Sequence, residues 1–459
     1  MMKREIPLLS TLDHPHIVKI YAYAEDMVKS EFVLILEHLA GGDCHRMGAC
    51  REATAARLVH QVLLALAHCH SRGILHRDVK PDNMVLSVVP AKGAELDCKL
   101  IDFGIAAQHE LTVRETCGTP GYIAPEIILD TAEFTGKADM WSLGVTAVEI
   151  LTGILPFGTL EDHGGDLRTW MKRVTQYEDL EDFEPFLGGS REWQSCSPLA
   201  KDFIRKLLNP DPEQRLAAKD ALNHQWLQEH KAASMTLTSE MLQSLAAYVD
   251  APSLVRCCLY IIVARHGVPD LEKFGAAFLS IDTDGDGMIS RDDLAKAIDQ
   301  VSTWWGPSVC PDQLLNAADL DHTGCLNFTQ FVAACIYSRH VIGGQFDLLL
   351  SQSFEALDAD RDGQVSVDDI RPLFRERDSP LLQRLPQDRP FGQGEWSACL
   401  RLAWQDDSKA VDSYKLGFMG VMDDMLKNFA CSQAPRPSDP ADMIEVPAQP
   451  AISRSPLII

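Results

Sequence analysis

The spacing of hydrophobic positions changes along the first half of the chain. Residues 17–23 and 32–38 are short runs rich in β-branched and aromatic side chains, which predicts two strands. In residues 52–71, hydrophobic side chains recur every three or four positions, so we expect an amphipathic helix. Residues 139–152 are apolar on nearly every face, which predicts a buried helix. This half is therefore expected to hold a few strands followed mainly by helices.

The second half repeats one pattern. Residues 239–265 contain two amphipathic helical segments. After them, a unit made of a helix, an acidic loop and a second helix recurs, with loops that begin at Asp282, Asp319 and Asp358, a period of 37 to 39 residues. From Pro435 onward the chain is rich in Pro, Ser and Asp and poor in aromatic residues, which predicts a disordered tail. The repeat predicts a second, wholly helical domain.

Composition narrows the class of protein. With 459 residues, of which 46% are hydrophobic and 24% charged, the chain is expected to form two or three globular domains. The formal net charge of −24 argues against nucleic acid as the main partner, and it suits a protein that collects divalent cations or binds basic peptides. The same charge is equally compatible with a plain solvated surface.

Cysteine usage and targeting features indicate where the protein acts. The thirteen cysteines show neither zinc-type pairing nor a disulfide framework, which is typical of a reducing compartment. The start of the chain is not a signal peptide, and the longest apolar run, near residues 254–264, is too short to span a bilayer. We therefore expect a soluble cytoplasmic protein, with membrane association left open.

Three short motifs follow one another in the first half. The second begins nineteen residues after the first ends, and the three read His76-Arg77-Asp78-Val79-Lys80-Pro81-Asp82-Asn83, Asp102-Phe103-Gly104 and Gly118-Thr119-Pro120-Gly121-Tyr122-Ile123-Ala124-Pro125-Glu126. Their order and spacing resemble the catalytic loop, the metal-binding loop and the end of the activation segment of protein kinases. One tripeptide alone would be weak evidence, but three in order leave chance at below roughly 1%.

This resemblance implies a chemical role for each residue. Phosphoryl transfer depends on positioning and charge neutralisation more than on covalent catalysis. Asp78 is expected to accept the proton of the substrate hydroxyl or to orient that hydroxyl, and Lys80 to contact the transferred phosphate. Asn83 and Asp102 are expected to hold Mg²⁺ between the phosphates of ATP. The combination of Lys80 with Thr119 resembles the serine/threonine branch of the family rather than the tyrosine branch.

Further positions resemble the nucleotide and substrate cleft of the family. The backbone groups of Glu37 and Leu39 are expected to bind adenine. Asp43 lies where related kinases read a basic residue before the phosphorylated Ser or Thr, and we count it with the residues of the ATP-binding cleft. Glu126 and Arg215 are expected to pair and to stabilise the lobe, which is a structural role.

The beginning of the chain departs from the kinase pattern. Glu5 lies where the family has the glutamate of its αC helix, and only four residues precede it. The glycine-rich loop and the strand lysine of the family come before that glutamate. The sequence is therefore either an incomplete copy of an active enzyme or a short form without catalysis. The joint presence of Asp78, Asn83 and Asp102 favours the first interpretation.

Two of the acidic loops fit the twelve-residue EF-hand pattern, in which alternate oxygen ligands surround calcium and a central glycine permits a sharp turn. The ligand sets are Asp282, Asp284, Asp286, the Met288 carbonyl, Ser290 and Asp293 in one loop, and Asp358, Asp360, Asp362, Gln364, Ser366 and Asp369 in the other. Both loops end in Asp where the pattern usually has Glu. The shorter carboxylate is expected to weaken calcium binding or to shift the preference toward Mg²⁺.

Two further loops are degenerate. The loop of residues 319–330 ends in a neutral amide, Gln330, so we expect a weak or empty site. Its candidate ligands are Asp319, Asp321, Thr323 and Cys325. A fourth unit, near residues 406–417, keeps an acidic start but lacks the central glycine and the last ligand. We expect it to be a structural EF-hand that pairs with the third one.

The order of these parts resembles the calcium-dependent protein kinases of plants and protists. The resemblance covers roughly residues 1–430 and implies an α+β, protein-kinase-like fold followed by an all-α EF-hand domain. The expected parts are a remnant of the kinase N-lobe with the αC helix and the following strands (1–37), the helical kinase C-lobe (38–229), autoinhibitory junction helices (230–270), a calmodulin-like domain with four EF-hand units (271–430) and a disordered tail (431–459).

The resemblance also implies a mode of regulation. In that family the junction blocks the substrate cleft at rest, and calcium-loaded EF-hands capture it. Residues 239–250 contain no Lys or Arg, so steric or allosteric blocking fits better here than a basic pseudosubstrate. The expected anchors, which fit ordinary core packing equally well, are Met241, Leu242, Leu245, Tyr248 and Val249, followed by Leu254, Val255, Cys258, Leu259 and Ile262.

We therefore predict a calcium-regulated protein serine/threonine kinase that uses ATP, Mg²⁺ and Ca²⁺ and transfers the γ-phosphate of ATP. Its expected partners are protein substrates, including those with a basic residue before the Ser or Thr, and its own junction helix. We expect a monomer. One alternative is a catalytically inactive calcium sensor that binds partners through the kinase lobe. A calcium buffer is a weaker alternative, because two of the four loops are degenerate.

Overall fold

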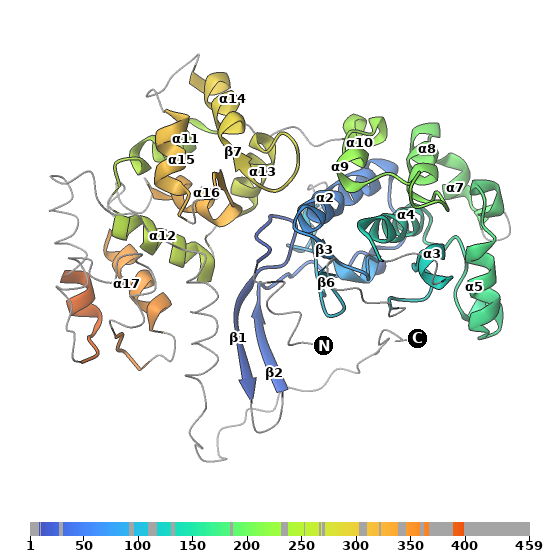
Figure 1. The fold of residues 1–459 in the computed structure, drawn as a ribbon, viewed down its shortest axis with the longest axis horizontal. Helices are drawn as coiled ribbons and strands as arrows, with labels where there is room; N and C mark the ends of the chain where they lie inside the picture. Colours follow the sequence, from blue (N-terminus) through green and yellow to red (C-terminus); the bar gives the residue numbers. More distant parts are fainter. Residues whose placement is uncertain are drawn as a thin grey trace. The chain divides into compact units, whose positions relative to one another are not determined.

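A computed structural model describes most of the chain. The described residues are 9, 11–26, 31–90, 96–108, 117–129, 134–183, 187–230, 237–251, 253–265, 268, 271–302, 310–320, 323–337, 346–358, 362–366 and 389–398. They fall into two compact units, one built mainly from residues 37–230 and the other mainly from residues 237–398 (Figure 1). The hairpin of residues 20–36 groups with the second unit. Glu5 lies outside the described residues.

The first unit is mostly helical. Its elements are η1 (His45–Met47), α2 (Glu52–Ser71), β3 (Ile74–Leu75), η2 (Pro81–Asn83), β4 (Met84–Leu86), β5 (Cys98–Leu100), β6 (Ala107–Gln108), α3 (Pro125–Ile128), α4 (Gly136–Thr152), η3 (Glu161–His163), α5 (Leu167–Thr175), η4 (Leu180–Phe183), α7 (Arg191–Ser195), α8 (Pro198–Leu207), α9 (Ala218–Ala221) and α10 (Gln225–His230). The helices predicted over residues 52–71 and 139–152 are confirmed as α2 and most of α4.

The helix α4 forms the centre of this unit. Every residue from Ala138 to Thr152 is buried, as its all-round hydrophobic sequence predicts. The helix begins where the Thr135 hydroxyl accepts a hydrogen bond from the Lys137 N–H at 3.3 Å. It ends at Gly153, whose φ of 73° is in the left-handed region that glycine adopts at little cost.

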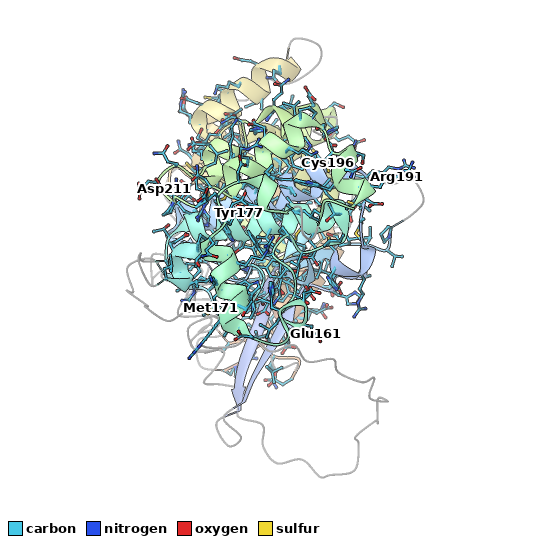
Figure 2. The ribbon with its side chains drawn as sticks, turned by 90° about the vertical axis from the view of Figure 1, so that its right-hand side faces the viewer. Glu161, Met171, Tyr177, Arg191, Cys196 and Asp211 are labelled. Atoms are coloured by element: carbon cyan, nitrogen blue, oxygen red, sulfur yellow. The ribbon has the colours of Figure 1, made fainter. Side chains whose placement is uncertain are left out.

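Aromatic packing surrounds one face of α4. The Trp141 ring stacks on Phe157 with the ring centroids 5.6 Å apart. The buried Tyr177, labelled in Figure 2, meets both rings edge-on at 5.6 and 5.3 Å. Such geometry adds roughly 0.5–1.5 kcal/mol per pair beyond the burial of area, so this cluster fixes the segment that follows α5 against the central helix.

Short antiparallel strand pairs frame the loops of the first unit. Strand β3 pairs with β6 through Ile74 and Gln108, and β4 pairs with β5 through Met84 and Leu100. The segment between β3 and β4 contains the first of the three motifs, and the segment between β5 and β6 contains the second. The two pairs therefore bring both motifs to one side of α2 and α4.

Two longer strands form a hairpin of their own. They are β1 (Ile20–Asp26) and β2 (Glu31–Leu36), which pair antiparallel from Ile20 opposite Leu36 to Asp26 opposite Glu31. The two strands predicted at residues 17–23 and 32–38 therefore exist, although the first begins three residues later than expected. Ile17 instead pairs with Leu100 in a parallel bridge.

The second unit is a set of helices joined by acidic loops. Its elements are α11 (Ser239–Tyr248), α12 (Ser253–Arg265), α13 (Leu271–Ile281), β7 (Ile289–Ser290), α14 (Arg291–Ser302), α15 (Pro311–Ala318), β8 (Cys325–Leu326), α16 (Phe328–Cys335) and α17 (Phe346–Leu357). Strands β7 and β8 pair antiparallel through Ile289 and Leu326, which joins the first two acidic loops.

The two predicted junction helices, α11 and α12, belong to the core of this unit. Met241, Leu242 and Tyr248 of α11 are buried in one hydrophobic cluster with Phe278 and Phe331 of the neighbouring helices. Figure 1 shows α11 beside α15 and α16, and α12 beside α17. The hydrophobic stripe of α11 therefore packs against the acidic-loop helices. None of the described helices has the length and hydropathy to cross a membrane.

A buried ion pair ties the end of the first unit to its middle, as the sequence predicts. Arg215 and Glu126 form two parallel hydrogen bonds of 2.7 and 2.9 Å. The guanidinium also donates to the carbonyls of Asn209 and Lys137 at 2.9 and 2.7 Å, and it lies 5.1 Å from the centre of the Trp141 ring. Arg215 is 1% exposed, so solvent cannot replace these bonds.

We expect Glu126→Gln to lower the free energy of unfolding of this unit by about 3–5 kcal/mol, because it leaves the buried Arg215 charge without its partner. Glu229→Gln is the matched control. It alters an exposed contact with the Gln225 amide of 2.8 Å and should cost less than about 1 kcal/mol. Urea unfolding of both variants of the full chain, followed by tryptophan fluorescence, measures the difference. Equal losses in the two variants would contradict this account of the pair.

Candidate active site and calcium loops

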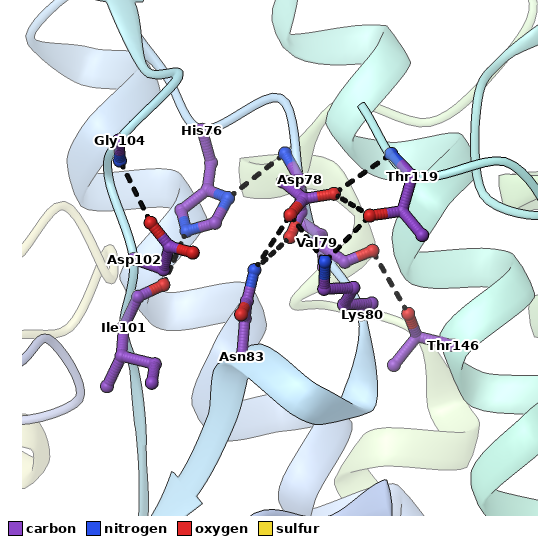
Figure 3. Close-up of polar contacts among 10 residues, drawn as sticks. All are labelled: His76, Asp78, Val79, Lys80, Asn83, Ile101, Asp102, Gly104, Thr119 and Thr146. Atoms are coloured by element: carbon purple, nitrogen blue, oxygen red, sulfur yellow. Dashed lines mark hydrogen bonds and ion pairs between the residues drawn. The ribbon is translucent and has the colours of Figure 1, made fainter. Parts of the chain in front are cut away.

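The first and third motifs of the first unit share one hydrogen-bond network (Figure 3). The Lys80 Nζ donates to the Asp78 carboxylate at 2.6 Å and to the Thr119 hydroxyl at 2.7 Å. Thr119 in turn donates to the other oxygen of Asp78, from its hydroxyl at 2.6 Å and from its N–H at 3.1 Å. The Asn83 amide donates to the Asp78 carbonyl at 2.8 Å. Asp78, Lys80 and Asn83 are all buried, so the network is rigidly held.

A buried carboxylate on α4 holds the backbone of this network. Asp139 accepts hydrogen bonds from the N–H groups of His76 and Arg77 at 3.0 and 2.7 Å. Its third partner is the His70 ring at the end of α2, at 2.8 Å. Burial alone would raise the pKa of Asp139, but the hydrogen bond and charge of His70 outweigh it and lower the pKa below the ordinary value. Asp139 therefore remains a carboxylate that can accept all three bonds.

The second motif is fixed to the first through a histidine. The ring of His76 contacts the Ile101 carbonyl at 3.0 Å and accepts from the Asp78 N–H at 3.2 Å. Its face meets Phe103 edge-on, with the ring centroids 4.7 Å apart. Asp102, next to Phe103, is therefore placed beside Asp78 and Asn83, as Figure 3 shows.

Two residues of this site adopt unusual backbone angles. Arg77 has a φ of 68° and Asp102 a φ of 61°, in the left-handed region that is costly for residues with a side chain. Each costs on the order of 1 kcal/mol or more and persists only because surrounding contacts enforce it. Here those contacts are the Asp139 bond to Arg77 and a bond from the Gly104 N–H to the Asp102 carboxylate at 3.1 Å.

The oxygen atoms near Asp102 suit a magnesium ion. Asp102 is exposed, and one of its carboxylate oxygens accepts from Gly104. The Asn83 amide nitrogen is used in bonds to Asp78, which leaves its oxygen outside these bonds. The backbone of the two segments is joined by the Ile101 N–H, which donates to the Asn83 carbonyl at 2.9 Å. Carboxylate and amide oxygens are hard ligands of the kind that Mg²⁺ prefers.

The residues predicted for the remaining cleft have other side-chain partners. The Glu37 carboxylate pairs with Lys99 at 2.8 Å and accepts from the Lys19 N–H at 3.2 Å. The Glu37 N–H donates to the Lys19 carbonyl at 2.8 Å, so of its backbone groups only the carbonyl remains for the predicted contact with a nucleotide. Leu39 follows it in the segment that links β2 to η1. Asp43 pairs with Arg46 at 3.0 Å, and its backbone forms a bridge with Val85. The Asp43 carboxylate is thus occupied by a residue of its own chain.

Sequence reasoning missed further long-range contacts in this unit. His70 bonds to Asp139, and the Tyr122 hydroxyl donates to Glu149, which also contacts His45 at 3.1 Å. Burial raises the pKa of Glu149 above its ordinary value and is also the largest cause of the raised pKa of Tyr122. These partners lie far apart along the chain, so no local spacing could have revealed them. A buried acid or histidine within a hydrophobic helix was the only available signal.

The first acidic loop has the geometry of a cation site. Carboxylate oxygens of Asp282, Asp284 and Asp286 lie within 4.8 Å of one another. The Asp282 carboxylate accepts from the N–H groups of Gly285 and Gly287 at 2.9 and 2.8 Å, and Gly287 has a φ of 77°. Burial, with the nearby charges of Asp286 and Asp284, raises the pKa of Asp282 to about 7. A divalent cation among these oxygens would offset that crowding of like charge.

The last ligand of this loop already caps the next helix. Asp293 accepts from the Ser290 N–H at 3.1 Å and from the Ser290 hydroxyl at 2.5 Å. It is also bonded to the Thr283 hydroxyl. Met288 donates its N–H to Asp286 at 2.8 Å, which leaves its carbonyl as the predicted ligand. The six predicted ligands of the first loop therefore lie in one folded turn.

The other two loops are described only in part. In the third loop, Asp358 accepts from the Gly363 N–H at 3.0 Å and Asp362 from the Gln364 N–H at 2.7 Å. Asp360 and Asp369 lie outside the described residues, as does Asp321 of the second loop. In the first loop, Asp282 and Asp286 occupy the same first and fifth positions and accept the same backbone bonds.

The second loop has lost its last ligand to helix capping. The Gln330 side chain accepts from the Asn327 N–H at 2.9 Å, and Asn327 accepts from the Gln330 N–H at 2.9 Å, which forms a capping box for α16. Asp319 accepts from the N–H groups of Thr323 and Gly324 at 3.1 and 2.8 Å. The Cys325 carbonyl, a predicted ligand, accepts from the Thr323 hydroxyl at 3.1 Å. This loop folds through its own side chains.

The third loop has a partner that the sequence did not predict. Val365 exchanges both backbone hydrogen bonds with Phe391, at 3.0 and 2.9 Å. The sequence predicted residues 406–417 as the partner because that segment begins with acidic residues. The observed β-bridge instead joins two hydrophobic residues, Val365 and Phe391. Residues 406–417 themselves lie outside the described residues.

Comparison with known proteins agrees with both parts of the chain. The protein kinase domain family matches residues 1–227, and the EF-hand family matches residues 274–298 and 350–371. Among similar proteins, Calcium-dependent protein kinase 3 of Plasmodium yoelii yoelii is 29% identical over 378 residues, which cover 80% of this chain and 66% of that protein. Calcium-dependent protein kinase 9 of Arabidopsis thaliana is 28% identical over 383 residues, which cover 82% of this chain and 66% of that protein.

The chain spans about two thirds of the length of these curated relatives. Its matches follow one order, with the kinase domain first and the EF-hands after it, and the described helices are consistent with that order. The chain therefore contains a protein kinase domain followed by EF-hands, and over about 80% of its length it is similar to calcium-dependent protein kinases.

Proposed function

We propose that this protein is a calcium-regulated serine/threonine kinase that transfers the γ-phosphate of ATP to proteins. The observation that carries the proposal is the closed network of Asp78, Lys80 and Thr119 beside Asn83 and Asp102. Structural ion pairs explain a buried Lys–Asp contact by itself. They do not explain why this linked lysine, threonine and aspartate lie next to the exposed carboxylate of Asp102 and the amide oxygen of Asn83, which both suit a metal ion.

In this mechanism each residue of the network has one task. Asp78 accepts the proton of the substrate hydroxyl or orients that hydroxyl. Thr119 holds one oxygen of the Asp78 carboxylate and Lys80 holds the other, so the carboxylate is fixed for this task. Lys80 stabilises negative charge on the transferred phosphate. Asn83 and Asp102 would hold Mg²⁺, which supplies neutralisation of the phosphate charge when it is bound. Thr119 bonds to both Asp78 and Lys80 and so holds the two side chains in place.

Calcium control is proposed to act through the second unit. The first loop brings three carboxylates together, and the hydrophobic stripe of α11 is part of the core built on the helices around it. A change in the angle between α13 and α14 on calcium binding would alter the surface on which α11 packs. This supports regulation by capture of the junction helix rather than by a basic pseudosubstrate.

The catalytic part is tested by phosphate transfer from ³²P-labelled ATP to a basic serine peptide. We expect calcium-stimulated transfer by a chain to which a glycine-rich loop and a strand lysine have been added. In that chain Asp78→Asn should lower kcat by about 10²- to 10⁴-fold, because the hydroxyl loses its proton acceptor. Asp220→Asn, an exposed acid on α9, is the matched control and should leave kcat unchanged.

Two outcomes would count against this proposal. Transfer that is absent from both the given and the extended chain would indicate a calcium-controlled binding module. Transfer that survives Asp78→Asn at the parent rate would remove Asp78 from the mechanism.

The calcium part is tested by titrating the full chain with calcium in a calorimeter. We expect Asp293→Asn to weaken the site of the first loop at least about ten-fold, because it removes a charged ligand while an oxygen remains to cap α14. Asp299→Asn, exposed further along α14, is the control and should change nothing. A titration that is identical for the parent and Asp293→Asn would place calcium binding elsewhere.

A further inference from the structure

The strand-like bridges between acidic loops follow one register. Ile289 is the eighth residue counted from Asp282, and its partner Leu326 is the eighth counted from Asp319. Val365 is likewise the eighth residue counted from Asp358. Its partner is Phe391, with both backbone hydrogen bonds formed. By the same count, Phe391 is the eighth position in a numbering that starts at residue 384 and reaches twelve at residue 395, of which the structure describes residues 389–395.

The helix that follows Phe391 obeys the same count. Helix α14 begins at the tenth residue of the first loop, Arg291, and α16 begins at the tenth residue of the second, Phe328. Residues 393–398 are also helical, and Gln393 is the tenth residue counted from position 384. Two independent features, the bridge and the helix start, thus agree on one register.

A third feature is the residue directly after the loop. In the first two loops this thirteenth position is Leu294 and Phe331, which are 1% and 0% exposed. At the new position it is Trp396, which is 1% exposed. The Trp396 indole donates to the Ser353 hydroxyl of α17 at 2.9 Å, and its ring stacks with Phe391 at 6.4 Å. The segment therefore packs against the helix that enters the third loop, as the second member of an EF-hand pair does.

The charged residues of this segment differ from those of a calcium loop. The sixth position, which is Gly287, Gly324 and Gly363 in the other loops, is Arg389 here. The Arg389 guanidinium binds the carboxylate of Glu395, the twelfth position, through two contacts of 2.6 and 3.2 Å. This hydrogen bonding lowers the pKa of Glu395 below its ordinary value. The twelfth residue is the one that grips calcium with two oxygens in a binding loop.

We propose that residues 389–395 are the second half of a fourth EF-hand loop in which the Arg389 guanidinium takes the place of calcium against Glu395. The loop pairs with the third loop through Val365 and Phe391 with no metal ion of its own. This inference rests on the calcium-binding part of the proposed function. It adds that residues 389–395 supply their own cation, the Arg389 guanidinium, and therefore stay paired with the third loop at any calcium concentration.

The decisive experiment restores a binding loop. Arg384→Asp, Pro386→Asp and Arg389→Gly, made together, supply acids at the first and third positions and glycine at the sixth, with Asp388 and Glu395 already present. Calorimetric titration of the full chain should then show one more calcium ion per molecule than the parent binds. Adding Glu395→Gln to these three changes should remove that ion, which makes it the matched control.

An unchanged ion count in the triple variant, with the far-ultraviolet circular dichroism of the parent, would overturn the register. In the parent background, Glu395→Gln should leave the ion count unchanged, and loss of an ion there would overturn the role of Arg389. A parent that binds no calcium would sink the proposed function, while an ion gained by the triple variant would still support this inference.

A charge exchange tests the ion pair itself. In chelator, Arg389→Glu and Glu395→Arg should each lower the melting temperature of the second unit, and the double exchange should recover most of the loss. A double variant that melts no higher than the singles would show that Arg389 does not replace a cation at Glu395.

Discussion

The site of the first unit depends on the carboxylate of Asp139. It is fully buried in α4, and burying a charge costs several kcal/mol unless hydrogen bonds replace its water. The N–H groups of His76 and Arg77 and the ring of His70 supply those bonds. The same contacts force Arg77 into its left-handed backbone angle and so aim Asp78 at Lys80 and Thr119. Without this acid, the N–H groups of His76 and Arg77 would lose their acceptor, and the left-handed angle of Arg77 would lose that support.

Much of the site could be predicted because its residues lie close together in the sequence. Asp78, Lys80 and Asn83 are within six residues, and the ligands from Asp282 to Asp293 are within twelve, so their resemblance to the kinase and EF-hand motifs can be recognised in short stretches of sequence. The contacts of the supporting residues could not be predicted, since Asp139 and His70 belong to helices whose hydrophobic patterns do not show which groups they bond to. The partner of the third loop was missed for a related reason. Acidic residues drew attention to 406–417, but the bridge is formed by Phe391.

Acidic groups of this strongly negative chain are neutralised in two different ways. Glu126 has the Arg215 guanidinium, and Glu395 has that of Arg389, so the chain itself supplies the cation in both cases. The three carboxylates from Asp282 to Asp286 are instead crowded together, and backbone N–H groups are the partners of Asp282. Crowding of like charge in a half-closed turn stores free energy that a divalent cation releases.

The packing of α11 explains how such a release could act on this helix. Phe278 lies near the end of the helix that enters the first loop, and Phe331 directly follows the second loop, with ring centroids 5.7 Å apart. Both belong to the core that buries Met241 and Tyr248 of α11. Dense cores transmit small shifts because their side chains have few alternative packings. Calcium in the first loop would therefore act on α11 through Phe278 and Phe331. The third loop is paired with residues 389–395, which carry their own cation, and would stay in place during that movement.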